Sequence, residues 1–171
     1  IAFLPIADND VFDLACRNAA ITHGAPEAYL AAGAVALMIR YMMLGRGGVA
    51  AVLSTRDYLA RHHADDGRDC LRAIDVAVKA SLESPTTSVI NAIPETLGYR
   101  NAFLAIPVLA QAAYAFMISE EMPANAEDKF RSTLSIAVTH AGDSDSVGAI
   151  VGNGLGALWG ESALPRDWLA P

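Results

Sequence analysis

A short run of acidic and hydroxyl residues carries the side chains best suited to chemistry. Residues 143–146 read Asp-Ser-Asp-Ser and directly precede an apolar, glycine-rich segment typical of a helix. Carboxylate and hydroxyl oxygens are the ligands that hard divalent cations prefer. If Asp143 lies in the helix cap and Asp145 in the first turn, both can face one ion, because the chain is not yet fully wound there. Ser146 then adds a hydroxyl oxygen to this candidate cation site.

The same run also has a purely structural interpretation. Carboxylates near a helix N-terminus are stabilised by the helix dipole without any metal. Asp and Ser side chains can also cap the first turn by accepting hydrogen bonds from backbone N–H groups. A doubly capped helix start in a plain helical scaffold and a cation site are therefore equal interpretations of this pattern alone.

Three other places could belong to a site. His23 follows a threonine and precedes a glycine, although a histidine ending a helix is also favoured there by the helix dipole. Gly98 and Tyr99 precede an apolar segment, and a glycine loop at a helix N-terminus can bind phosphate. Their spacing matches no P-loop or dinucleotide motif. His140, just before the acidic run, either supports the site or packs in the core. No catalytic triad can be assembled.

Four glycines recur at every fourth residue after the acidic run, namely Gly148, Gly152, Gly156 and Gly160. At this spacing they form one stripe along a helix, and each costs about 1 kcal/mol relative to alanine. The pattern predicts a neighbouring helix backbone in tight contact with the stripe. Such a contact would hold the acidic end of the helix rigid.

The composition favours a single all-α domain over residues 1–171. Hydrophobic residues make up 53% of the chain and the mean hydropathy is +0.31. Much of the excess is alanine, which favours helix over strand. Aromatic residues make up only 7%, and β-branched residues are scattered, so strands are not expected.

The acidic charge balance excludes some classes of partner. A net charge of −7 argues against binding to a nucleic-acid backbone or to anionic lipid. The two cysteines show no zinc spacing and are too few for a disulfide framework. No apolar run reaches the roughly 18 residues needed to span a bilayer, and no signal peptide is visible. We therefore expect a cytoplasmic protein with reduced thiols and no membrane partner.

Hydrophobic periodicity and helix-stop residues predict about eight helices joined by short loops. The expected segments are residues 11–20, 26–44, 49–62, 68–82, a shorter piece after 84, 101–119, 126–141 and 145–159, with a short final element at 164–168 and a turn at 120–123. Asp8 or Asp10 is expected to cap the first helix. Leu71, Ile74 and Leu82 lie at helical spacing in the fourth predicted helix, residues 68–82. The helix over 26–44 is apolar on most faces and should be central.

Residues 139–168 resemble the C-terminal signature of the ADP-ribosylglycohydrolase family, which includes the dinitrogenase reductase-activating glycohydrolases. The resemblance lies in Gly-Asp-Ser-Asp-Ser at 142–146 and Gly-Asn-Gly-Leu-Gly-Ala-Leu-Trp-Gly at 152–160. Residues 20–27, Ala-Ile-Thr-His-Gly-Ala-Pro-Glu, look like the family's internal Thr-His motif. Gly98-Tyr99 is similar to a third family landmark. Together these motifs cover essentially the whole chain.

The resemblance implies a compact, orthogonal multi-helix domain that carries two divalent cations, Mg²⁺ or Mn²⁺. The implied metal ligands are Asp143, Asp145 and Ser146. His23 would lie along an ADP-ribose site, with Gly98 and Tyr99 nearer its adenosine end. The implied reaction removes ADP-ribose from a modified protein side chain or small molecule by attack at the ribose anomeric carbon. No catalytic residue is identified.

The chain also departs from the family pattern. The family's first metal motif, of Thr-Asp-Asp-Thr type, belongs well upstream of His23 and is not found, and the family's glycine-rich diphosphate-binding segment is also absent. Ala2 stands where an arginine is common, and Leu104 where an acidic residue is common. We therefore expect residues 1–171 to be the C-terminal half or more of the family's domain, with part of the catalytic apparatus. The alternative is a non-catalytic relative, crystallin-like or ADP-ribose-binding, that keeps the fold.

Overall fold

The computed structural model describes residues 1–121 and 125–169, and these residues form nine α-helices, one 3₁₀ turn and no strand. In chain order they are α1 (Asp8–Ala20), α2 (Pro26–Met43), α3 (Gly48–His62), α4 (Arg68–Ala80), α5 (Thr87–Thr96), α6 (Ala105–Ile118), α7 (Ala126–Val138), α8 (Ser144–Trp159), η1 (Glu161–Ala163) and α9 (Arg166–Leu169). The predicted all-α fold is confirmed. Within the described residues, no helix combines the length and hydropathy that crossing a membrane requires.

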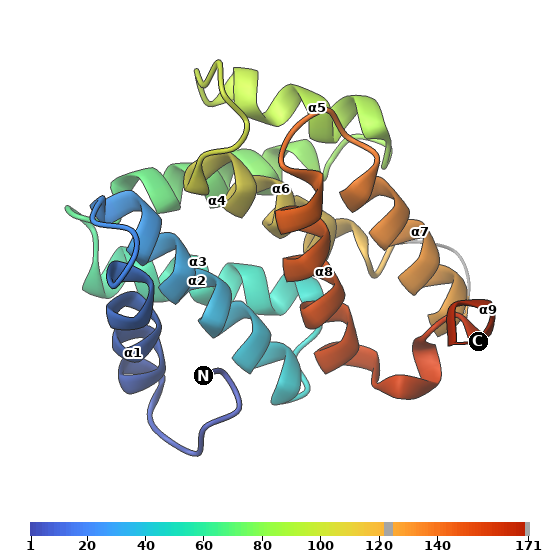
Figure 1. Ribbon diagram of the computed structural model, residues 1–171, viewed down its shortest axis with the longest axis horizontal. Helices are drawn as coiled ribbons and strands as arrows, with labels where there is room; N and C mark the ends of the chain where they lie inside the picture. The colour runs from blue at the N-terminus through green and yellow to red at the C-terminus, as the bar shows by residue number, and fades with distance from the viewer. Residues whose placement is uncertain (122–124, 170–171) are drawn as a thin grey trace.

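Helix α6 lies at the centre of the molecule and contacts six other helices, α2, α3, α4, α5, α7 and α8 (Figure 1). Every residue from Ile106 to Ile118 is buried, which suits a helix that is apolar on nearly all sides. The helix begins at Ala105 rather than at residue 101. Residues 101–104 instead form a turn, in which the Asn101 side-chain oxygen accepts a hydrogen bond from the Phe103 N–H at 2.9 Å.

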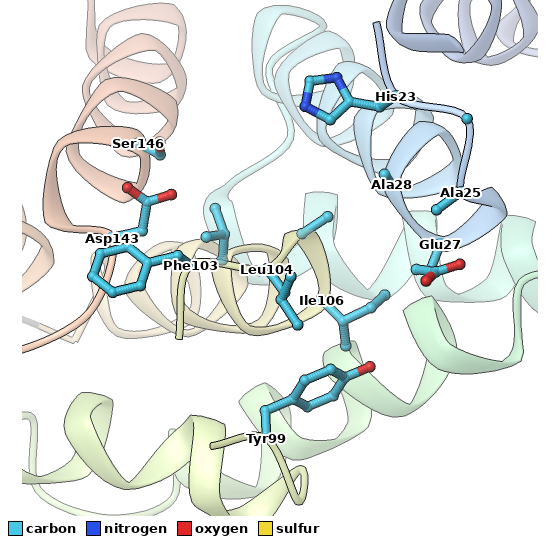
Figure 2. A pocket seen from close by; sticks show the side chains of 13 residues that line it. His23, Ala25, Glu27, Ala28, Tyr99, Phe103, Leu104, Ile106, Asp143 and Ser146 are labelled. Atoms are coloured by element: carbon cyan, nitrogen blue, oxygen red, sulfur yellow. The ribbon is translucent and has the colours of Figure 1, made fainter. Parts of the chain in front are cut away.

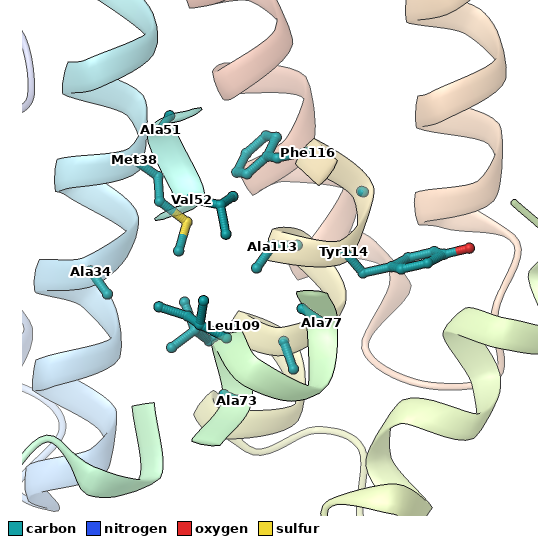
Figure 3. Packing of buried hydrophobic residues seen from close by; sticks show 14 of the residues in the cluster. Ala34, Met38, Ala51, Val52, Ala73, Ala77, Leu109, Ala113, Tyr114 and Phe116 are labelled. Carbon is teal, nitrogen blue, oxygen red and sulfur yellow. The ribbon is translucent and has the colours of Figure 1, made fainter. Parts of the chain in front are cut away.

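The core lies where α2, α3 and α4 pack around α6 (Figure 3). Met38, Leu109 and Phe116 are fully buried there. Burying a side chain of this size contributes about 1.5–3 kcal/mol. Alanines on the facing helices, such as Ala73 and Ala113, leave room for these large side chains and let the helix axes approach closely.

Helix α1 begins without a side-chain cap, and its first carboxylate makes a tertiary contact instead. Ala7 is the N-cap residue and makes no side-chain hydrogen bond. The Asp8 carboxylate instead accepts hydrogen bonds from Arg40 Nε at 2.7 Å and from the Tyr41 hydroxyl at 3.0 Å, both on α2. The prediction that Asp8 or Asp10 caps this helix is therefore wrong.

Other differences from the expected elements lie at helix ends. Helix α4 stops at Ala80, and Leu82, expected on its core face, is 84% exposed just beyond it. Helix α7 stops at Val138 rather than at residue 141. Met122 and Pro123, in the turn expected at 120–123, lie outside the described residues.

The glycine stripe of α8 faces side chains rather than a helix backbone. A Cβ added at Gly148 would lie 2.6 Å from Val138 Cγ1 of α7, and one at Gly152 would meet its nearest neighbour only at 4.0 Å. A Cβ at Gly156 would meet nothing within 4 Å. Gly160 follows the helix with φ of 73°, a backbone conformation that favours glycine. The predicted backbone contact along the stripe is therefore wrong.

The tightest approach of α8 to the core occurs at Gly154, which lies outside the stripe. A Cβ at this position would overlap the buried ring of Phe116 on α6 and lie 3.3 Å from Met42 Sδ on α2. Glycine at this position therefore allows α8 to pack directly on α6 and α2.

Candidate functional site

The acidic run lies at the start of α8, where the sequence places it. Asp143 is the N-cap residue, but its side chain makes no capping hydrogen bond. Its carbonyl oxygen accepts the first helical bond, from the Val147 N–H at 3.0 Å. Asp145 is exposed in the first turn, and Ser146 is half-buried beside it. The Asp143 side chain therefore does not cap the helix, contrary to the purely structural interpretation, and its carboxylate remains available to a ligand.

The two carboxylates of the run lie next to each other. A hydrogen bond between the Asp143 and Asp145 carboxyl groups, more than the nearby backbone N–H groups, lowers the pKa of Asp145. Two carboxyl groups this close together also suit a cation. Residues 1–121 and 125–169 contain no group of three or more His, Cys, Asp or Glu arranged to hold a metal. The donor set here is two carboxylates and the Ser146 hydroxyl.

Two polar side chains, Asn91 and His140, hold the loop that precedes α8. The Asn91 side-chain oxygen on α5 accepts a hydrogen bond from the Ala141 N–H at 2.8 Å. His140 is buried, and its Nδ1 accepts a hydrogen bond from the Gly142 N–H at 3.0 Å, so the neutral ring carries its proton on Nε2. Burial lowers the pKa of His140 and so keeps this form dominant. His140 therefore positions the loop. Nothing in the sequence indicated that Asn91 also holds it.

A pocket of about 500 Å³ opens beside the start of α8 (Figure 2). Its walls come from the α1–α2 loop and α2, the α5–α6 loop and α6, and the start of α8. The lining residues are His23, Gly24, Ala25, Glu27, Ala28, Tyr99, Phe103, Leu104, Ala105, Ile106, Val108, Asp143 and Ser146. The structure thus brings together four of the six residues expected at the site. Asp145 and Gly98 are not among the lining residues.

Gly98 is the residue that ends helix α5. Its φ is 79°, its N–H donates to the Glu95 carbonyl at 2.8 Å, and the Tyr99 N–H donates to the Pro94 carbonyl at 2.9 Å. This pair of bonds is a Schellman motif, which requires a left-handed residue at the position of Gly98. The turn redirects the chain so that Tyr99 reaches the pocket. A direct role of Gly98 in substrate binding stays a prediction.

His23 lies in the loop between α1 and α2, beyond the last helical residue, Ala20. Its Nδ1 lies 2.8 Å from the Thr22 hydroxyl oxygen, so the threonine orients the ring. Whichever of the two groups donates, this contact occupies Nδ1. The other ring nitrogen, Nε2, is then available to a ligand in the pocket.

The charged lining of the pocket is acidic. Glu27 and Asp143 line it, and no lysine or arginine among the described residues does. Phe103, Leu104 and Ile106 make an apolar wall between these carboxylates. Sequence reasoning gave Glu27 no role, although it ends the Thr-His motif at 20–27, and missed Phe103, which no motif marks.

A model of the ADP-ribosylglycohydrolase family matches residues 1–171. The chain belongs to the ADP-ribosylglycohydrolase family. Neither a curated protein nor a solved structure matched it. The family resemblance inferred from the motifs is thus confirmed, and membership supports a glycohydrolase of this type. In this member of the family, all three of the recognised motifs contribute to the walls of one pocket.

Proposed function

We propose that this protein is a metal-dependent ADP-ribosylglycohydrolase that removes ADP-ribose from a modified protein side chain or small molecule. The observation that carries the proposal is the convergence of three separated motifs on one pocket. His23, Tyr99, Asp143 and Ser146 all line it. In a chain of this family, such a pocket is the natural place for the ADP-ribosyl group.

The acidic end of the pocket suits two divalent cations, Mg²⁺ or Mn²⁺. Asp143, Asp145 and Ser146 would hold them, with water and substrate oxygens completing the coordination, as is common for Mg²⁺. This all-oxygen donor set disfavours zinc. Because no lysine or arginine lines the pocket within the described residues, positive charge from the cations would offset the substrate diphosphate. When bound, the cations would orient ribose hydroxyls and activate the attacking water.

The side chains of this protein have their own tasks in the reaction. The bond at the anomeric carbon breaks through an oxocarbenium-like transition state, which carries positive charge. The Asp143 carboxylate, free of capping bonds and facing the pocket, would stabilise this charge. His23, oriented by Thr22, would donate a hydrogen bond from Nε2 to the diphosphate when that nitrogen is protonated. The apolar wall would exclude bulk water from the ribose.

The first test replaces one carboxylate of the acidic end. In the full-length protein, Asp145→Asn removes a ligand charge and should abolish metal-dependent release of ADP-ribose, and calorimetry should show weaker Mn²⁺ binding. Asp10→Asn is the matched control, because Asp10 is also an exposed aspartate in the first turn of a helix but belongs to α1 and not to the acidic run. Full activity of Asp145→Asn would overturn the proposal.

A further inference from the structure

The pocket has a second acidic end, away from the start of α8. Figure 2 shows Asp143 and Ser146 on one side of the pocket, and Glu27 and Tyr99 on the opposite side. Glu27 is exposed in the first turn of α2. Its carboxylate makes no hydrogen bond and no ion pair with any residue in 1–121 or 125–169. This carboxylate is therefore free to meet a ligand.

Tyr99 lies in the electrostatic field of this carboxylate. Burial, followed by the negative charges of Asp69 and Glu27, raises the pKa of Tyr99. Its phenol therefore remains a neutral hydrogen-bonding group across the working pH range. Glu27 supplies the only charged side chain at this end of the described lining, so a phosphate placed here would meet repulsion.

The chemistry of this end selects a planar group with an N–H donor. An ionised carboxylate only accepts hydrogen bonds, so it attracts an amino group and repels a carbonyl oxygen. The neighbouring side chains of Leu104 and Ile106 are apolar and offer contact area to a flat ring.

We infer that Glu27 accepts a hydrogen bond from the 6-amino group of the substrate's adenine ring and makes the protein favour adenine over a purine that has no N–H donor at this edge. The inference rests on the proposed function, which places the anomeric carbon at the Asp143 end. Any group attached to that carbon, including the guanidinium of a modified arginine, would lie at that end too. The base is the opposite end of ADP-ribose and so reaches Glu27.

The test compares the binding of two ligands by calorimetry at saturating Mg²⁺, ADP-ribose and its nebularine analogue, in which a hydrogen atom replaces the 6-amino group. The wild-type protein should prefer ADP-ribose by about tenfold, as expected for a partly exposed bond to a charged acceptor. In Glu27→Gln the side-chain amide can present either an acceptor or a donor. The preference should therefore fall to within about twofold, while ADP-ribose still binds.

Asp69→Asn is the matched control, because Asp69 also acts on Tyr99 but lies outside the lining. It should keep the wild-type preference. An unchanged preference in Glu27→Gln, no preference in the wild type, or an equal loss in Asp69→Asn would overturn the inference alone, since ADP-ribose would still bind. Failure of the wild-type protein to bind ADP-ribose would overturn both the inference and the proposed function.

Discussion

At the scale of single residues, Arg40 ties the N-terminal segment to helix α2. Its Nη1 and Nη2 donate to the carbonyl oxygens of Leu4 at 2.9 Å and Ile6 at 2.6 Å, while its Nε pairs with Asp8 at 2.7 Å. Only a guanidinium can reach three acceptors in this forked arrangement. The contact holds residues 4–8 beside α2 and so fixes the entry of the chain into α1.

Replacing this arginine by lysine should therefore destabilise the protein although the charge is kept. Arg40→Lys loses the fork geometry, and we expect the free energy of unfolding in urea to fall by about 1–3 kcal/mol. Arg17→Lys is the control, because Arg17 is exposed in the last turn of α1 and no described residue pairs with it. Equal effects of the two substitutions would show that the fork contributes nothing.

At the scale of elements, the packing of α8 depends on which of its glycines meets a neighbour. Gly154 faces the buried Phe116 ring and Met42, whereas Gly156, two residues on, faces open space. The spacing of the stripe alone would rank Gly156 as the contact residue and Gly154 as incidental. The structure reverses this order, since the helix presents the Gly154 side to α6 and α2.

Two alanine substitutions separate these roles. Gly154→Ala forces a methyl group into the packed core and should lower the free energy of unfolding by about 1–3 kcal/mol. Gly156→Ala only restores helix propensity and should raise it by up to about 1 kcal/mol. Urea denaturation followed by circular dichroism measures both. We expect the two changes in the free energy of unfolding to have opposite signs. Changes of the same sign would contradict the packing described for α8.

At the scale of the whole molecule, stability depends on keeping buried thiols and phenols protonated. Burial is the main cause that raises the pKa of Cys16 from 9.0 to about 11 and that of Cys70 from 9.0 to about 12. Burial also contributes most to raising the pKa of Tyr41 and Tyr58 from 10.0 to about 12. Each group is neutral when protonated, so its buried environment disfavours the ionised form.

The sign of the pH dependence follows by linkage. Because the folded-state pKa values lie above the unfolded ones, this stability is fully present below about pH 9 and is lost as pH rises towards 11–12. We expect the Tm to fall steeply between pH 9 and 11. The Cys16→Ala/Cys70→Ala variant should lose less Tm over this range, whatever its Tm at pH 8. An equal loss would show that the thiols are not responsible.

The same burial protects the thiols from reagents. Alkylation requires the thiolate, so at pH 8 a shift from 9.0 to about 11 should slow the reaction of Cys16 roughly 100-fold relative to the urea-unfolded chain. Reaction with iodoacetamide, followed by mass spectrometry, gives the two rates. Similar rates in the folded and unfolded chains would contradict the burial of these thiols.

Local signals in the sequence predicted much of this protein. Alanine content, apolar periodicity and stop residues indicated the all-α fold and most of the helices, because these preferences act within one or two turns of chain. The position of Asp143 at the start of α8 followed for the same reason, since a helix begins where the local composition changes. The three motifs that carry the family resemblance could also be recognised from residue order alone.

Only the tertiary structure decided which of these residues meet. The Asp8 carboxylate pairs with Arg40 instead of capping its helix, and Gly154 rather than the stripe meets α6. Glu27 faces the same pocket as Asp143 although the two lie on different helices. Such contacts depend on the packing of segments far apart in the chain. The hydrophobic periodicity of a segment does not show which neighbour it packs against, because each segment satisfies its own local preferences whichever neighbour it meets.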